Sequence, residues 1–238
     1  MSSEKEAKAL EAKNLGNAAL AKKDYDTAIK YFSAGLTYTP NNHVLFSNRS
    51  AAQAAAGNFE EALKDANEAI RCKPDWFKGY SRKGLALYNL KRPEESVAAY
   101  KKAVELDPSN EGNKDALKKA EGALKAAEFT VLGEEFLNKK KYQAANDHFQ
   151  KAVDLVPTSK LYQSNLSHAQ TLLGRYADAL KSADAAVAIA PEWFRGYQRK
   201  AEAFAANRDY QSALPWFARA VQLAPDNEPL SRAFSQCQ

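Results

Sequence analysis

Three cations and two amides stand at matching places in the first half of the 238-residue chain. They are Lys13, Asn17, Asn48, Lys78 and Arg82, and no acid is among them. Lys13 and Asn17 are four residues apart, as are Lys78 and Arg82, so each pair projects from one face of a helix. Hydrogen bonds from such groups to carboxylates contribute about 1.5–3 kcal/mol each before ordering costs. This five-residue set predicts a site for a peptide C-terminus ending in Asp, which carries two carboxylates on one residue.

Regularly spaced prolines indicate the elements that position this set. Two runs of prolines have an interval of 34 residues: Pro40, Pro74 and Pro108, then Pro157, Pro191 and Pro225. With each proline at the thirty-second place, the chain contains six repeats: 9–42, 43–76, 77–110, 126–159, 160–193 and 194–227. The two halves also repeat each other, because the string Trp76-Phe77-Lys78-Gly79-Tyr80 corresponds, 117 positions later, to Trp193-Phe194-Arg195-Gly196-Tyr197.

Each repeat has the pattern of a helix hairpin. Small residues recur at the eighth, twentieth and twenty-seventh places, often with an aromatic at the twenty-fourth, as in Gly16, Ala28, Phe32 and Gly35. Two antiparallel helices can approach closely only where one side is small. The proline stops the second helix, since it has no N–H to donate. The sequence therefore predicts an all-α solenoid of six helix-turn-helix repeats in two sets of three.

This pattern resembles the tetratricopeptide repeat family, whose period is 34 residues. The sequence departs from the family pattern at Ser50, Ser167 and Ala201 in the eighth place, and at Ala66 and Ala183 in the twenty-fourth. In such a solenoid the first helices of the repeats line a concave groove. The resemblance thus implies that the five-residue set, which falls on first helices, faces that groove.

A 15-residue insert, Glu111–Lys125, separates the two sets of repeats. Leu117, Ala120 and Leu124 have helical spacing, so we expect a helix that caps the third repeat and continues into the helix beginning near Ala126. This predicts two domains, residues 1–125 and 126–238, the second ending in a short cap helix. That cap is indicated by Leu230 and Phe234, four residues apart.

The five-residue set also matches, position by position within the repeats, the two-carboxylate clamp of tetratricopeptide repeat co-chaperones of the Hop type. The resemblance implies a cytoplasmic adaptor that binds the C-terminal tail of Hsp70 or Hsp90, each ending Glu-Glu-Val-Asp. Because the two tails share these last residues, the choice between them stays open, although the resemblance favours Hsp70. Ala51, Ala54 and Ala55 predict a small apolar wall for an aliphatic side chain farther upstream in the peptide.

The second half keeps only part of this set. The corresponding residues are Thr130, Glu134, Asn165, Arg195 and Arg199. Glu134 would repel a carboxylate, at a cost on the order of 1 kcal/mol. We expect Arg195 and Arg199 to pair with Glu134 and close the site. Residues 126–238 are then predicted to bind such tails weakly or not at all, or to take a different protein partner.

Other functions have less support in the sequence. An enzyme is not indicated, because phosphate-binding glycine loops, zinc-binding histidine pairs and nucleophile elbows are missing and His43, His148 and His168 stand far apart. A net charge of +5 and the run Lys139–Lys141 raise nucleic-acid binding as a distant alternative. A general scaffold using the second groove or the convex face is the nearer alternative.

Composition sets the remaining expectations. The chain is 45% hydrophobic and 26% charged, which permits a folded core and excludes wholesale disorder. Two cysteines, 165 positions apart, suggest neither a disulfide framework nor a metal site. Apolar segments of membrane-spanning length, about 20 residues, are missing as well. We therefore expect a monomer with no cofactor, no metal, no membrane anchor and no nucleic-acid partner.

Overall fold

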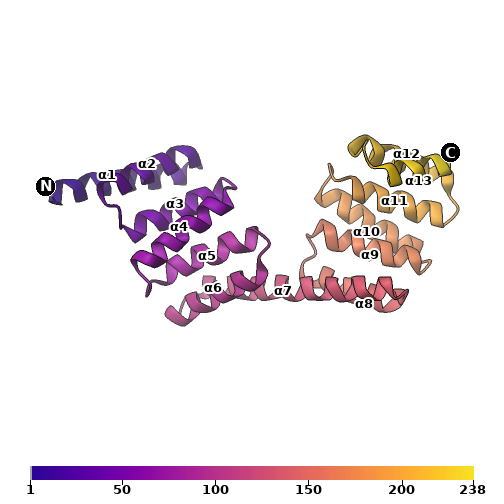
Figure 1. Ribbon diagram of the computed structural model, residues 1–238, viewed down its shortest axis with the longest axis horizontal. Helices are drawn as coiled ribbons and strands as arrows, with labels where there is room; N and C mark the ends of the chain where they lie inside the picture. Colours follow the sequence, from indigo (N-terminus) through magenta and orange to yellow (C-terminus); the bar gives the residue numbers. More distant parts are fainter. Residues whose placement is uncertain (1) are drawn as a thin grey trace. The chain divides into compact units, whose positions relative to one another are not determined.

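The structure is a computed structural model that describes residues 2–238, and in these residues all regular secondary structure is helical (Figure 1). The all-α fold class is therefore confirmed. The described helices are α1 (Ser2–Ala21), α2 (Tyr25–Tyr38), α3 (His43–Ala55), α4 (Phe59–Cys72), α5 (Phe77–Asn89), α6 (Pro93–Leu106), α7 (Glu111–Asn138), α8 (Tyr142–Leu155), α9 (Lys160–Leu172), α10 (Tyr176–Ile189), α11 (Phe194–Ala206), α12 (Tyr210–Leu223) and α13 (Glu228–Cys237).

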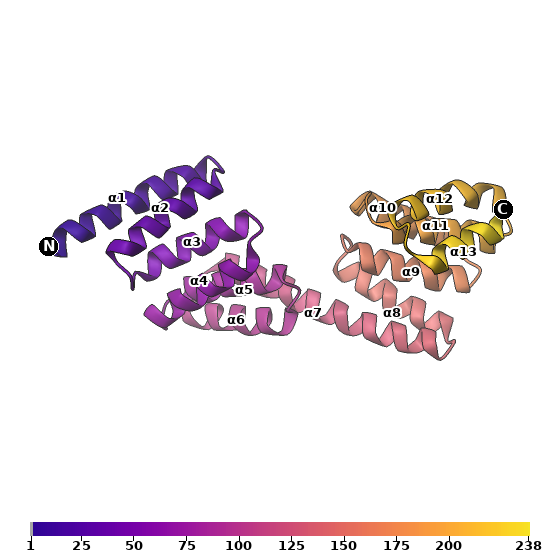
Figure 2. The same cartoon turned by 45° about the horizontal axis from the view of Figure 1, so that its top comes forward.

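Successive helices form antiparallel hairpins that stack on one another. In the first half, α1 packs on α2, α3 on α4 and α5 on α6, and neighbouring hairpins touch through α2 with α3 and α4 with α5. The second half repeats this with α9 on α10 and α11 on α12, followed by α13 against α12. Figures 1 and 2 show the hairpins in this order from two directions. The hairpin order agrees with the predicted repeats.

Hairpin packing depends on a small residue facing an aromatic ring. A Cβ atom added to Gly16 of α1 would lie 2.5 Å from Cε1 of Phe32 on α2. The same contact recurs between Gly133 of α7 and Phe149 of α8 at 2.5 Å. Both rings are fully buried. The glycines therefore set how closely the two helices of a hairpin approach.

Each hairpin turn contains one residue with positive φ. Gly57 and Gly174 fill this place in two turns, with φ of 85° and 73°. Four turns use a residue with a side chain instead: Lys23, Lys91, Lys140 and Arg208, with φ of 55–62°. The left-handed conformation costs a residue with a side chain about 1–2 kcal/mol, which the packing of the two flanking helices offsets.

The helix α1 begins well before the first repeat. Its described residues start at Ser2, whereas the repeat starts at residue 9. Neither Pro nor Gly interrupts this segment, and Lys8 binds Glu4 one turn away at 2.8 Å. The helical propensity of these residues extends the helix beyond the repeat.

The described chain divides into two compact units, one ending at Leu124 and the other comprising Lys125–Gln238. The insert and the following repeat helix form one helix, α7, as the sequence predicted. Within the first unit, Ala120 of α7 packs against Val97 and Tyr100 of α6. In residues 2–238, a helix of the length and hydropathy needed to cross a membrane is not found.

Candidate functional site

The five-residue set lies on the first helices of three consecutive hairpins. Lys13 and Asn17 are on α1, Asn48 is on α3, and Lys78 and Arg82 are on α5. Contacts of α3 with both α1 and α5 bring the three helices together. Asn42 caps α3, because its side-chain oxygen accepts hydrogen bonds from the backbone N–H groups of Val44 and Leu45.

Two amides of the set are joined directly. Nδ2 of Asn48 donates a hydrogen bond to Oδ1 of Asn17 across 3.1 Å. This bond uses the acceptor of Asn17 and orients its Nδ2 away from Asn48. Within the described residues, Nδ2 of Asn17 has no acceptor, so its N–H groups are available to an incoming ligand.

Arg82 is a half-buried cation that has no counter-ion among the described residues. Its Nε is buried and lacks a hydrogen-bond partner within the described chain. Burial lowers the pKa of the guanidinium, and the nearby Tyr100 opposes this shift. Burial in turn raises the pKa of Tyr100 to about 12, so its hydroxyl is neutral at physiological pH. A buried cation that lacks a partner is energetically costly, and an anionic ligand would relieve that cost.

The other two cations likewise lack an ion-pair partner in the part of the chain that the structure describes. Lys78 is exposed, with its ammonium 6.0 Å from the ring centroids of both Trp76 and Phe77. Lys13 is half-buried on α1. Within residues 2–238, neither ammonium forms an ion pair with an acid. The set thus presents three positive charges that internal salt bridges do not neutralise.

Another cation nearby, Arg49 on α3, is structural. Its guanidinium makes two 2.7 Å bonds to the buried carboxylate of Asp65 on α4 and donates to Ser33 of α2 at 2.9 Å. The bonds to Asp65 raise the pKa of Arg49. Sequence reasoning did not single out this pair, and only the hairpin geometry joins residues 16 positions apart.

The predicted apolar wall is only partly available to a ligand. Ala51 is half-buried and Ala55 is exposed, whereas Ala54 packs against the core cluster that contains Leu87. Leu85 on α5, 36% exposed, is a further apolar residue that sequence reasoning missed. It stands one turn after Arg82, so the helical spacing of the two residues could have identified it.

In the second unit, Glu134 does not pair with the arginines. Oε1 of Glu134 accepts a hydrogen bond from Nδ2 of Asn165 at 3.3 Å. The expected ion pairs of Glu134 with Arg195 and Arg199 are therefore wrong. Arg199 instead binds Glu202 at 2.7 Å, because Glu202 lies one turn away on the same helix, whereas Glu134 lies on α7. Arg195 is exposed beside the ring of Phe194.

The remaining member of the second set faces its own helix. Thr130 is 7% exposed, and its hydroxyl donates to the carbonyl of Ala126 at 2.9 Å. A pocket of about 510 Å³ lies farther along the second unit, between α9, α11, α12 and α13. His168, Leu172, Glu202 and Tyr210 contribute to its lining. Within the described residues, no cluster of three side chains suited to hold a metal ion is present.

Several surface lysines, among them Lys139 of the run that raised nucleic-acid binding, lie beside acids. Lys102 binds Glu105 at 2.6 Å and Lys101 lies 3.4 Å from Glu121. Lys139 lies 3.7 Å from Glu135. Acids thus accompany these cations, unlike those of the five-residue set.

Family models described as tetratricopeptide repeat match residues 77–110 and, in a second model, residues 13–77, 130–192 and 173–228. Among curated proteins, the chain is 46% identical over 125 residues to "Protein STIP1 homolog" of Dictyostelium discoideum, covering 52% of this chain and 22% of that protein. It is 47% identical over 116 residues to "Hsp70-Hsp90 organizing protein" of Triticum aestivum, covering 49% of this chain and 20% of that protein. The chain thus spans about a fifth of the length of these two relatives.

A solved structure shows the same fold along nearly the whole chain. The crystal structure of the P58(IPK) TPR domain aligns with a TM-score of 0.70, covering 97% of this chain and 64% of that one. The two sequences are 16% identical, so this likeness concerns the fold alone.

Proposed function

The chain belongs to the tetratricopeptide repeat family, and from that premise we propose that it is a non-enzymatic co-chaperone adaptor. Its first unit would bind the acidic C-terminal tail of Hsp70 or Hsp90 in the cytoplasm. Relatives named Hsp70-Hsp90 organizing protein support this proposal, because their similarity to the chain reaches 47% identity over 116 residues. We propose residues 1–125 and 126–238 as its two functional domains.

The observation that carries the proposal is the unpaired, half-buried guanidinium of Arg82. A carboxylate beside it would accept charge-assisted hydrogen bonds and supply the missing counter-ion. Lys78, one turn earlier on α5, adds a second donor to the same carboxylate. We assign this pair to the side chain of the terminal Asp.

The main-chain carboxylate of the peptide would meet the other three residues. Asn48 holds Asn17 so that Nδ2 of Asn17 remains free, and Lys13 lies one turn before Asn17 on α1. Two carboxylates on one residue would thus be recognised by side chains from three helices. A C-terminal amide would lose one of the two charges, which gives the proposal a direct test.

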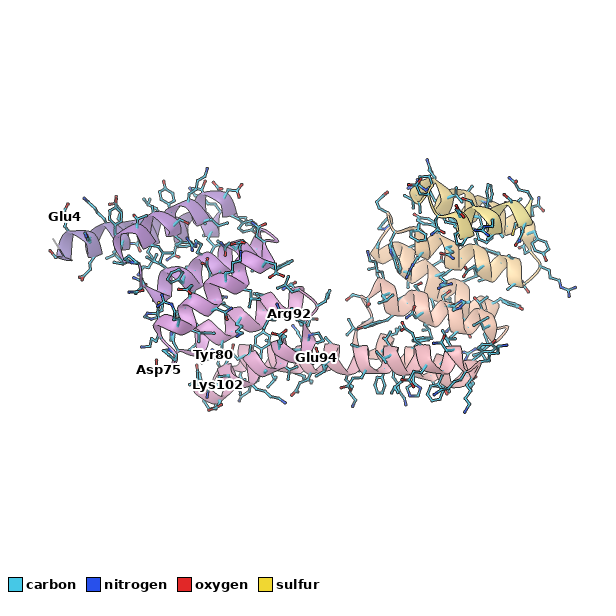
Figure 3. The ribbon with its side chains drawn as sticks, viewed as in Figure 1. Glu4, Asp75, Tyr80, Arg92, Glu94 and Lys102 are labelled. Atoms are coloured by element: carbon cyan, nitrogen blue, oxygen red, sulfur yellow. The ribbon has the colours of Figure 1, made fainter. Side chains whose placement is uncertain are left out.

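The test is a calorimetric titration with a peptide ending Glu-Glu-Val-Asp, as the free acid and as the amide. We expect micromolar affinity for the acid, about −8 kcal/mol, and a loss of at least about tenfold for the amide. Lys78→Ala/Arg82→Ala should abolish binding. The matched control is Lys102→Ala on α6 (Figure 3), whose ammonium is paired with Glu105 at 2.6 Å. Equal binding of acid and amide, or full binding by the double variant, would refute the proposal.

A scaffold role for the second unit is the alternative that a specific observation favours. The 510 Å³ pocket lies in that unit, and Leu172 in its lining is 41% exposed. This arrangement suits a protein partner with an apolar side chain better than an acidic tail. Such a role is compatible with tail binding by the first unit.

A further inference from the structure

Arg82 and Arg199 occupy the same place in their repeats but have different neighbours. The offset between the two halves is 117 residues, which relates Arg199 to Arg82. The same offset relates His168 to Ala51 and Glu202 to Leu85. The second half therefore carries an imidazole and a carboxylate where the first carries a methyl group and an isobutyl group.

In the second unit these two polar residues hold the guanidinium of Arg199. Nη1 donates to Oε2 of Glu202 at 2.7 Å and lies 3.2 Å from Nδ1 of His168. Nδ1 of His168 is in turn 4.0 Å from Oε2 of Glu202. On the other edge, Nε of Arg199 donates to Oγ of the buried Ser164 at 3.4 Å.

The three side chains form a partly desolvated cluster. Side-chain exposure is 18% for Arg199, 28% for Glu202 and 34% for His168. Electrostatic interactions are stronger at such a site than in bulk water. A peptide carboxylate that approached Arg199 would therefore have to displace or closely approach the carboxylate of Glu202.

The first unit provides the matched contrast. Ser47 is buried at the position equivalent to Ser164, yet Nε of Arg82 has no partner among the described residues. Ala51 and Leu85 offer the guanidinium neither an acceptor nor a negative charge. The same arginine is thus available in one unit and occupied in the other.

We infer that His168 and Glu202 are specificity-determining residues that occupy Arg199 and thereby close the second groove to acidic C-termini. We call these two residues the clip. The inference rests on the proposed function of the first unit, because it assumes that a free guanidinium at this place binds a carboxylate. It assigns the difference between the two grooves to a pair of residues outside the five-residue set.

The binding test uses the full chain with Lys78→Ala/Arg82→Ala, so that only the second unit can bind. The probe is the free acid of the Glu-Glu-Val-Asp peptide, with the amide as control. Glu134→Asn alone should leave acid binding by the second unit too weak for the titration to measure. Adding His168→Ala and Glu202→Leu should make acid-dependent binding measurable, with a Kd at least about tenfold below the weakest Kd that the titration resolves. Equal affinity with and without the clip would overturn the inference.

The reciprocal exchange places the clip residues at the equivalent positions of the first unit, which is proposed to bind the acidic tail. In an otherwise wild-type chain, Ala51→His/Leu85→Glu should weaken acid binding at least about tenfold while circular dichroism stays unchanged. A folded variant that retains wild-type affinity would contradict the inference. The first-unit proposal would survive that outcome, because wild-type binding is measured separately.

The clip also has a readout that needs no peptide. Burial and Arg199 lower the pKa of His168, and Glu202 raises it. In an NMR titration, Glu202→Gln should lower the pKa of His168 further, and Arg199→Gln should raise it. If neither substitution moved the titration, the clip would not be formed and the inference would fail. If the wild-type chain did not bind the peptide, the proposed function would be refuted. The NMR titration of His168 would then still test whether His168 and Glu202 hold Arg199.

Discussion

Asn48 of α3 donates a 3.1 Å hydrogen bond to Asn17 of α1, and Asn165 of α9 makes the corresponding bond to Glu134 of α7 at 3.3 Å. The separation is 31 residues in both cases. The bond is thus kept in the two units while its acceptor changes from an amide to a carboxylate. An amide retains N–H donors after accepting this bond, whereas a carboxylate retains none.

This difference predicts the effect of Asn17→Asp. Aspartate still accepts the bond from Asn48, but it cannot donate to a peptide carboxylate and it adds a negative charge. We expect the affinity for the Glu-Glu-Val-Asp acid to fall at least about tenfold, or ~1.4 kcal/mol, with little change in stability. Calorimetry and thermal unfolding measure the two quantities. Unchanged affinity would exclude Asn17 from the site.

Two glycines of α7 should respond in opposite ways to replacement by alanine. Beyond the adjoining backbone of its own helix, a Cβ at Gly122 would meet no atom of the described residues within 4 Å, so Gly122→Ala should stabilise the helix by about 0.5–1 kcal/mol. A Cβ at Gly133 would lie 2.5 Å from the ring of Phe149. Gly133→Ala should destabilise the second unit by about 1–3 kcal/mol. Urea unfolding monitored by hydrogen exchange measures the change in unfolding free energy of each variant. If both variants were stabilised, or both destabilised, the packing described for α7 and α8 would be contradicted.

The ion pair between Arg49 and Asp65 predicts a large loss of stability when one partner is removed. The Asp65 side chain is 6% exposed, so Arg49→Ala would leave its carboxylate buried without a counter-ion. We expect the first unit to lose about 3–5 kcal/mol of unfolding free energy. Arg92→Ala is the matched control, because Arg92 and Glu95 form a solvent-exposed pair whose loss should change the unfolding free energy little. Similar losses for both variants in chemical denaturation would argue against the structural role of Arg49.

His168 predicts a pH dependence of the second unit. Its pKa lies below the ordinary value of 6.5 because of burial and the positive charge of Arg199. The unfolded chain therefore binds this proton at a higher pH than the folded chain does. The stability of the second unit should fall as the pH drops below 6.5 and through the lower folded pKa.

His168→Gln should flatten this dependence. Hydrogen exchange of α9 and α11 amides between pH 7 and about 5 would resolve the second unit from the first, where the pKa of His43 is also lowered. A dependence that is as steep in the variant as in the wild type would exclude His168 as its source.

The hairpins could be predicted from the sequence because they depend on local signals. The prolines at intervals of 34 residues mark where second helices end. The glycine at position 16 and the aromatic at position 32 indicate a close contact between the two helices of a hairpin, which the structure contains. Helical spacing alone places Lys78 and Arg82 on one face of α5. Helix propensity and residue periodicity act over a few helical turns, so a single amino-acid sequence is enough to predict the hairpins.

The pairing of charges within the second groove was decided only by the tertiary structure. Arg199 could meet Glu134 or Glu202 by residue type, and the fold places Glu202 at 2.7 Å while Glu134 binds Asn165. The repeat pattern likewise did not show that Thr130 is buried or that Arg82 lacks a counter-ion. These outcomes depend on distances of a few ångströms between side chains of different helices. Residue spacing limits which groups are candidates, whereas packing determines which of them are within hydrogen-bonding range.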